Sequence, residues 1–286
     1  METTNMGGKV VLVTGATNGI GKVTALELAK MGATVVLVGR NAAKMERVLA
    51  EIRQEAGSAA KLDSIIGDLS LMKDVRQVAE AFLKRYERLD VLVNNAGGFF
   101  ANREETAEGY EMTFALNHLN YFLLTKLLLP VLKKSAPARI VNVSSGAHMG
   151  QTVHFDNLQR EKGYSSWRVY GESKLMNILF TRSLVKRLTG SGVTVNVLHP
   201  GFVSTSFGHG RGVFDFFIRL TQKLFAISPE EGAKTSIFLA SSPEVEGISG
   251  AYFAKSRPQQ PSQAAQDDAA ADKLWQISEE IVSRAG

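Results

Sequence analysis

Short apolar runs alternate with segments of helical periodicity along almost the whole chain. The runs are rich in Val, Ile and Leu, and Gly, Asp or Asn bounds most of them. Continuous β-branched runs of this length predict strands buried on both faces, as in a parallel sheet. The expected strands cover residues 9–14, 34–39, 62–67, 89–94, 139–144, 193–198 and 249–253.

The segments between these runs predict helices, because their apolar residues recur at intervals of three and four. The expected helices cover residues 19–31, 42–55, 72–86, 106–129, 166–189 and 229–239. Regular alternation of strand and helix implies right-handed crossovers. The pattern therefore predicts an α/β, Rossmann-type fold, with a doubly wound parallel sheet of about seven strands flanked by helices. No long linker interrupts it, so residues 1–286 are expected to form one domain.

The last third of the chain departs from this alternation. Residues 202–228 are expected to form a short substrate lid, and its apolar stripe at 213–225 also fits a core helix or an amphipathic membrane contact. Residues 256–266 are rich in Pro, Gln and Ser, which predicts an irregular connection. An amphipathic tail helix is expected at about 269–283, packed on the body through Leu274 and Trp275.

Composition removes several classes of protein. The chain has no cysteine, which excludes disulfides and thiolate zinc sites, and its five histidines form no HExxH set, so no metal is expected. The net charge is +5, but Lys and Arg are scattered, so we expect no nucleic-acid partner. No apolar stretch is long enough to span a bilayer, and the amino terminus lacks a signal peptide. We therefore expect a cytoplasmic protein with no stable membrane insertion.

A glycine-rich loop follows the first expected strand and leads into a helix. Glycines let the backbone approach a pyrophosphate, and the helix amino terminus supplies N–H donors. Between a strand and a helix, such a loop predicts a dinucleotide site. The loop residues expected to bind are Gly15, Thr17, Asn18, Gly19, Ile20 and Gly21.

The second strand ends at Gly39, followed by Arg40, where an acid would favour NAD. Arg40 suits the 2′-phosphate of NADP, and Lys44 lies one helical turn further on. The cofactor is therefore expected to be NADP(H). Further cofactor contacts are expected where the third and fourth strands end, at Asp68, Leu69, Asn95, Ala96 and Gly97.

Tyr170 and Lys174 are four residues apart in a helical segment and so share one helix face. A tyrosine pKa is ordinarily near 10, too high for an efficient base near neutral pH. A neighbouring ammonium would stabilise the phenolate and lower this pKa. The strand that ends at Ser144 and Ser145 supplies a hydroxyl group.

In combination, these elements resemble the short-chain dehydrogenase/reductase family of the classical type. The TGxxxGxG, NNAG, strand-end Ser, YxxxK and PG elements occur in the family's order over about residues 8–255. Residues 116–125, 139–145 and 198–201, with the carboxyl region from 248 to 275, are similar to its retinol dehydrogenase-like branch.

The resemblance implies a role for each matching residue. Tyr170 would donate the proton on reduction and accept it on oxidation, and Lys174 would bind the nicotinamide ribose and tune Tyr170. Ser145, rather than Ser144, would hydrogen-bond the substrate oxygen, and Asn117 would anchor a water relay to Lys174. The residues expected to border the nicotinamide are Pro200, Gly201, Val203 and Thr205. A homodimer or homotetramer through the 106–129 and 166–189 helices is also implied.

The expected activity is hydride transfer between NADP(H) and a carbonyl/alcohol pair on an apolar substrate resembling a retinoid, a steroid or a lipid aldehyde. Two departures weaken the retinoid assignment. The first strand begins near residue 9, leaving no amino-terminal anchor, and Asn120 and Tyr121 replace the expected Gly and His.

Three alternative functions use the same fold. A non-catalytic dinucleotide-sensing regulator is disfavoured by the intact set of catalytic residues. A sugar-nucleotide epimerase or dehydratase would have a larger carboxyl-terminal domain, and a tetrapyrrole reductase typically has a cysteine near its pocket.

Overall fold

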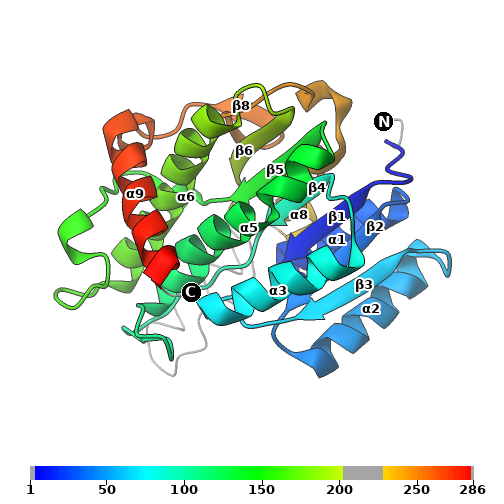
Figure 1. The fold of residues 1–286 in the computed structure, drawn as a ribbon, viewed down its shortest axis with the longest axis horizontal. Coiled ribbons are helices and arrows are strands. Elements are labelled where there is room, and N and C mark those ends of the chain that lie inside the picture. Colours follow the sequence, from blue (N-terminus) through cyan, green and yellow to red (C-terminus); the bar gives the residue numbers. More distant parts are fainter. Residues whose placement is uncertain (1–3, 202–227, 285–286) are drawn as a thin grey trace.

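An eight-stranded sheet organises residues 4–201 and 228–284, the part of the chain that this computed structural model describes. The spatial order is β3-β2-β1-β4-β5-β6-β7-β8, and the first seven strands in the sequence are parallel (Figure 1). The strands are β1 (Val10–Thr14), β2 (Thr34–Gly39), β3 (Leu62–Ile66), β4 (Val91–Asn94), β5 (Ala138–Val143), β6 (Val193–His199), β7 (Tyr252–Ala254) and β8 (Arg257–Gln259). The predicted doubly wound parallel sheet is confirmed.

The eighth strand is a correction to the sequence prediction. An irregular connection is expected over residues 256–266, but β8 pairs antiparallel with β7. The turn between them places Lys255 and Ser256 at φ 51 and 56, a conformation that usually selects Asn or Gly, so the usual turn signal is missing from the sequence. Pro258 is tolerated because β8 is the exposed edge strand and needs no further N–H donor.

Helices cover both faces of the sheet. Their bounds are α1 (Gly19–Lys30), α2 (Ala42–Ala56), α3 (Met72–Arg85), α4 (Met112–Phe114), the π-helical turn η1 (Ala115–Leu119), α5 (Asn120–Lys134), α6 (Ser166–Leu188), α8 (Pro229–Ser241) and α9 (Asp268–Arg284). Single 3-10 turns occupy η2 (Gly146–His148), η3 (Phe155–Asn157), η4 (Pro243–Val245) and η5 (Gln263–Gln266).

The helix predicted over residues 106–129 has different ends. It begins at Met112, because the carboxylate of Glu111 accepts hydrogen bonds from the N–H groups of Thr113 and Phe114. It then continues past Pro130 to Lys134. Pro130 is exposed, so the carbonyl that its ring leaves unpaired in the helix can meet solvent.

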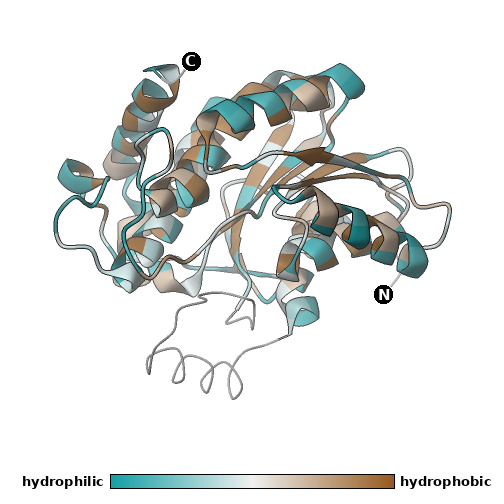
Figure 2. Cartoon of the chain, turned by 90° about the horizontal axis from the view of Figure 1, so that it is seen from below, coloured by the Kyte–Doolittle hydropathy of each residue, from teal (hydrophilic) through white to brown (hydrophobic). Residues whose placement is uncertain are grey.

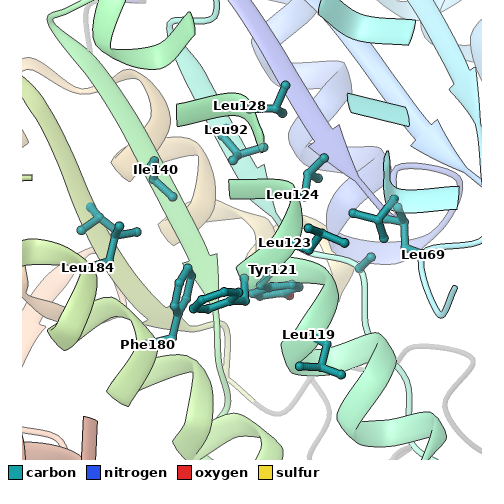
Figure 3. Close-up of a cluster of buried hydrophobic side chains, with 14 of the residues drawn as sticks. Leu69, Leu92, Leu119, Tyr121, Leu123, Leu124, Leu128, Ile140, Phe180 and Leu184 are labelled. Atoms are coloured by element: carbon teal, nitrogen blue, oxygen red, sulfur yellow. The ribbon is translucent and has the colours of Figure 1, made fainter. Parts of the chain in front are cut away.

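Two apolar layers enclose the sheet. On one face α1, α2 and α8 pack against alternate strand residues, and on the other α3, α5 and α6 do so, with α9 packed on α6. In Figure 3 the second layer joins Leu92 and Ile140 of the strands to Leu124, Leu128 and Phe180 of the helices. Figure 2 shows the consequence, with apolar strands between helices whose polar faces turn outward.

Helix α9 packs along α6 and reaches α5 (Figure 1). The Trp275 ring lies 4.8 Å from the Phe122 ring and 5.9 Å from the Phe180 ring, measured between centroids. Arg182 forms an ion pair of 2.9 Å with Asp268 at the start of α9. None of the helices in the described ranges has the length and hydrophobicity that a membrane crossing needs.

Candidate active site

The glycine-rich loop between β1 and α1 lies against the carboxyl end of β4. Gly15 has φ 64, and a Cβ on it would lie only 2.9 Å from Ala96 Cα. A Cβ on Gly21 would lie 2.5 Å from the Gly15 carbonyl oxygen. The Asn95 side chain holds this arrangement by donating to the Thr14 carbonyl at 2.8 Å. The loop can therefore approach β4 this closely only because Gly15 and Gly21 lack side chains.

The amino end of α1 is suited to an anion. Asn18 precedes the helix but its side chain does not cap it, and the first turn contains no acidic residue. The positive end of the helix dipole is therefore not neutralised by the helix's own first turn. Together with the glycine-rich loop, this arrangement fits a dinucleotide pyrophosphate.

The end of β2 presents a cation where the coenzyme ribose is expected. A Cβ at Gly39 would lie 2.8 Å from Thr17 Cγ2, which explains the small residue before Arg40. The Arg40 side chain is 73% exposed, and its Nη1 lies 3.8 Å from Asp68 Oδ2. The Asn41 side chain caps α2 by accepting from the Lys44 N–H at 2.8 Å, which puts Lys44 in the first turn.

The residues at the ends of β3 and β4 divide into binding and packing positions. Asp68 Oδ1 accepts from the Ser70 N–H and hydroxyl at 3.0 and 2.7 Å, so this oxygen shapes the local turn. Leu69 is a buried core residue, and only its backbone can face a ligand. Asn94 donates to Asn142 Oδ1 at 2.9 Å and so fastens β4 to β5.

The Ser145 side chain lies close enough to the Tyr170 hydroxyl to act on its pKa, which it lowers. Lys174 Nζ lies 5.6 Å from the Tyr170 ring centroid and donates to the Val143 carbonyl at 3.4 Å. Ser144 instead donates its hydroxyl to the Lys174 carbonyl at 2.7 Å. Only Ser145 of the two serines therefore faces Tyr170.

Burial shifts the pKa values of both ionisable groups. It raises the pKa of Tyr170 to about 12, against which the Ser145 hydrogen bond acts, and it lowers the pKa of Lys174 to about 8. Both shifts arise because a poorly solvated site disfavours charge. Lys174 is still mostly protonated at neutral pH, so its ammonium can favour a phenolate at Tyr170.

Asn117 lies in the π-helical turn and links three segments of the site. Its Nδ2 donates to the Gly98 carbonyl and to Ser173 Oγ, both at 3.0 Å, and its Oδ1 accepts from the Gly98 N–H at 2.8 Å. A Cβ at Gly97 would lie 3.1 Å from Asn117 Oδ1 and 3.2 Å from Lys174 Nζ. The structure thus gathers Gly97, Asn117 and Lys174, and π turns are frequent at functional sites.

At the end of β6, Gly201 has φ 92 and donates its N–H to His199 Nδ1 at 3.0 Å. Pro200 and Gly201 are the last described residues before the 202–227 gap. Val203, Thr205 and most of the predicted 202–228 lid lie outside the described residues.

Sequence reasoning missed an aromatic group beside Tyr170. The Phe99 ring lies 5.7 Å from the Tyr170 ring, edge to face, and 5.0 Å from the Trp167 ring. Trp167 is 45% exposed although its side chain is large and hydrophobic. Its spacing of three residues from Tyr170 on a helix was the available signal.

The family model for short chain dehydrogenases matches residues 9–212. The chain belongs to this family. Among short-chain dehydrogenases, human retinol dehydrogenase 14 is 44% identical over 97% of this chain and 87% of that protein. Mouse retinol dehydrogenase 12 is 43% identical over 96% and 86%. The resemblance to the retinol dehydrogenase-like branch is confirmed.

Solved structures agree with this family assignment. A protein from Mycobacterium paratuberculosis superimposes with a TM-score of 0.80 at 30% identity, covering 99% of this chain and 96% of that one. The NADP complex of RhlG, from Pseudomonas aeruginosa, gives 0.71 at 27% identity, covering 88% and 97%. This chain therefore has the fold of a family of oxidoreductases that use nicotinamide cofactors.

Proposed function

We propose that this short-chain dehydrogenase is NADP(H)-dependent and transfers a hydride between the nicotinamide and the carbonyl/alcohol group of an apolar substrate. The grouping of Tyr170 with Ser145 and Lys174 carries this proposal. The exposed Arg40 supports the choice of NADP over NAD.

Each site residue has a distinct task in the proposed reaction. On reduction the Tyr170 hydroxyl gives its proton to the substrate oxygen, and on oxidation the phenolate takes that proton back. Ser145 donates a hydrogen bond to the same oxygen. The Lys174 ammonium stabilises the phenolate, and Asn117 holds the segment between Gly98 and Ser173 in place. The bound nicotinamide supplies or accepts the hydride.

The coenzyme contacts follow the same geometry. Gly15, Thr17, Asn18, Gly19, Ile20 and Gly21 would hold the pyrophosphate. Arg40 and Lys44 would hold the 2′-phosphate, and Asp68, Leu69, Asn95, Ala96 and Gly97 would surround the adenosine. Lys174, Pro200, Gly201, Val203 and Thr205 would border the nicotinamide half.

Replacing Tyr170 with Phe tests the chemistry. We expect turnover to fall about 10²–10⁴-fold, the range typical for loss of general acid–base help. NADPH binding should persist, because only a hydroxyl group is removed. Tyr86→Phe is the matched control, since burial likewise raises the pKa of Tyr86 to about 12. Its hydroxyl donates to Asp63 at the start of β3, at the opposite end of the strands from the glycine-rich loop. Near-normal turnover in Tyr170→Phe would rule out the assigned mechanism.

The apolar substrate is supported by Phe99 and Trp167 and by the names of the similar retinol dehydrogenases. A series of straight-chain aldehydes of increasing length tests it with NADPH. Each buried methylene contributes about 0.8 kcal/mol, so kcat/KM should rise about threefold to fourfold per carbon. Trp167→Ala should flatten this rise, and Leu83→Ala, equally exposed at 45% on α3, should not. No dependence on length in the wild-type protein would exclude an apolar site.

We also propose a cytoplasmic location. A chain without cysteine needs no oxidising compartment to fold. Cell fractionation tests this, and recovery in the membrane pellet would contradict it.

A further inference from the structure

Three charged side chains are buried beside the catalytic helix and have no part in the proposed chemistry. Glu172 on α6 is 2% exposed and forms an ion pair with Arg160, which is 6% exposed. Glu111, ahead of α4, is fully buried. Arg160 also has φ 50, a backbone conformation that a residue with a side chain adopts only under constraint.

Glu172 lies between Tyr170 and Lys174 in the sequence and fastens residues 147–160 to α6. Its Oε1 accepts from the His154 N–H at 2.5 Å and lies 3.2 Å from His154 Nδ1. Next to it, a Cβ at Gly171 would collide with the Ala147 carbonyl. The chain from 147 to 160 is therefore held closely against the turn of α6 that carries Tyr170.

The same segment is fastened on its other side to the chain that leads to Asn117. The Gln159 side-chain oxygen accepts from the Glu111 N–H at 2.8 Å, and the Gln159 carbonyl accepts from Arg103 Nε at 2.9 Å. The Glu111 carboxylate caps α4 immediately before the π turn. Burial lowers the pKa of the Arg160 guanidinium, and the negative charge of Glu111 acts against this shift.

These charges are not explained by stability alone. A buried ion pair must overcome the loss of hydration of both ions, and apolar residues of similar size are often equally stable in its place. What Glu172 supplies is direction, because its ion pair with Arg160 and its Oε1 hydrogen bond from the His154 N–H together fix this segment more narrowly than apolar packing would.

We propose that Glu172 and Arg160 are positioning residues for the reaction. Together they clamp residues 147–160 between α6 and the Glu111 cap, and so fix Tyr170 relative to Asn117. This inference rests on the proposed role of Tyr170. It assigns to Glu172 and Arg160 no contact with substrate or cofactor.

The test compares the double variant Arg160→Met/Glu172→Met with Asp90→Asn. Asp90 is a matched control, because its carboxylate is also 2% exposed, pairs with cations and accepts a backbone N–H, from Val10 at 2.8 Å, but it lies at the opposite end of the strands. We measure Tm, the Kd for NADPH, and kcat and KM for a short aldehyde.

The double variant should keep the NADPH Kd and lose about 10–100-fold in kcat, as misplacement of a reacting group by about 1 Å does. Asp90→Asn should lower Tm and leave kcat unchanged. Arg160→Lys, which keeps the charge, should retain more kcat than Arg160→Met. If the double variant does not fold, Glu172→Gln, which keeps the size of the side chain, should show the same loss of kcat.

Wild-type kcat in the folded double variant, or in Glu172→Gln, would overturn the proposal. A loss of kcat in Asp90→Asn as large as that in the double variant would overturn it as well. Failure of the wild-type protein to reduce any aldehyde would instead refute the proposed function.

Discussion

Gly15 sits where the backbone has a positive φ and the neighbouring strand leaves no space. Gly8 has a similar φ of 77, but nothing lies within 4 Å of the place that a Cβ would take there. The two glycines therefore separate backbone strain from steric collision.

We expect Gly8→Ala to lower the free energy of unfolding by about 1–2 kcal/mol, the strain of the left-handed conformation. Gly15→Ala should lower it further, because the new Cβ meets Ala96 Cα, and it should also weaken NADPH binding by about tenfold or more, one lost contact of about 1.4 kcal/mol. Urea unfolding and fluorescence titration measure the two effects. Equal NADPH affinities in both variants would show that Gly15 serves only the fold.

Arg40 is a residue whose charge, and not its packing, should matter, since its side chain is 73% exposed. A charge-assisted hydrogen bond contributes about 1.5–3 kcal/mol, so Arg40→Ala should weaken NADPH binding about ten- to hundredfold. NADH, which lacks the 2′-phosphate, should bind nearly as before. Arg53→Ala, at the exposed end of α2, is the control. An equal effect on both coenzymes would remove Arg40 from the coenzyme site.

Among the elements, the π turn η1 has a second function besides presenting Asn117. His118 in the same turn lies 2.9 Å from Ser278 Oγ of α9, measured from Nε2. The Ser278 hydroxyl already donates to the Leu274 carbonyl at 2.8 Å, so His118 Nε2 must be the donor. The turn therefore connects the catalytic region to the carboxyl-terminal helix.

Burial lowers the pKa of His118 to about 3, from an ordinary value of 6.5. Between these values the unfolded chain binds a proton that the folded chain does not. The contribution of His118 to the free energy of unfolding is therefore complete above pH 6.5. It is lost as the pH falls toward 3, by at most about 1.4 kcal/mol per pH unit. Urea unfolding at several pH values gives the free energy of unfolding as a function of pH. Below pH 6.5 this free energy should fall less steeply with falling pH in His118→Gln than in the wild-type protein. An unchanged slope would mean that His118 is not the responsible group.

At the scale of the whole molecule, α9 bears on how copies of the chain can pair. The family resemblance predicts a homodimer or homotetramer through the 106–129 and 166–189 helices. In the structure α9 packs on α6 and pairs Glu279 with Lys126 of α5. We expect α9 to prevent pairing through the part of these helices that it covers, and the homodimer or homotetramer itself stays a prediction.

The absence of cysteine allows a direct test of this expectation. The variant Lys126→Cys/Glu279→Cys, treated with a short bismaleimide, should form a link within one chain and keep the mass of a monomer. Lys126→Cys alone should give no covalent dimer at the same protein concentration. A covalent dimer from Lys126→Cys alone would show that two α5 faces meet and that α9 leaves them.

The parallel sheet and much of the site were predictable from local sequence. Strands buried on both faces need continuous apolar runs, and a tight phosphate loop needs glycine at positive φ, so each feature leaves a mark within a few residues. Tyr170 and Lys174 share a helix face for the same local reason. The strand β8 left no such mark, because Lys255 and Ser256 adopt a turn conformation that neighbouring contacts impose.

Contacts between distant segments decided the rest. Which serine faces Tyr170 depends on how β5 packs on α6, because the Ser144 hydroxyl donates to the Lys174 carbonyl there. The Phe99–Trp167 group and the Glu172–Arg160 pair join residues 68 and 12 positions apart, and no periodicity connects them. Sequence determined the fold class and the chemical groups, because local conformation and hydrophobic burial encode them. Tertiary structure alone decided their distances, their hydration and hence their pKa values, because those depend on every segment packed around the site.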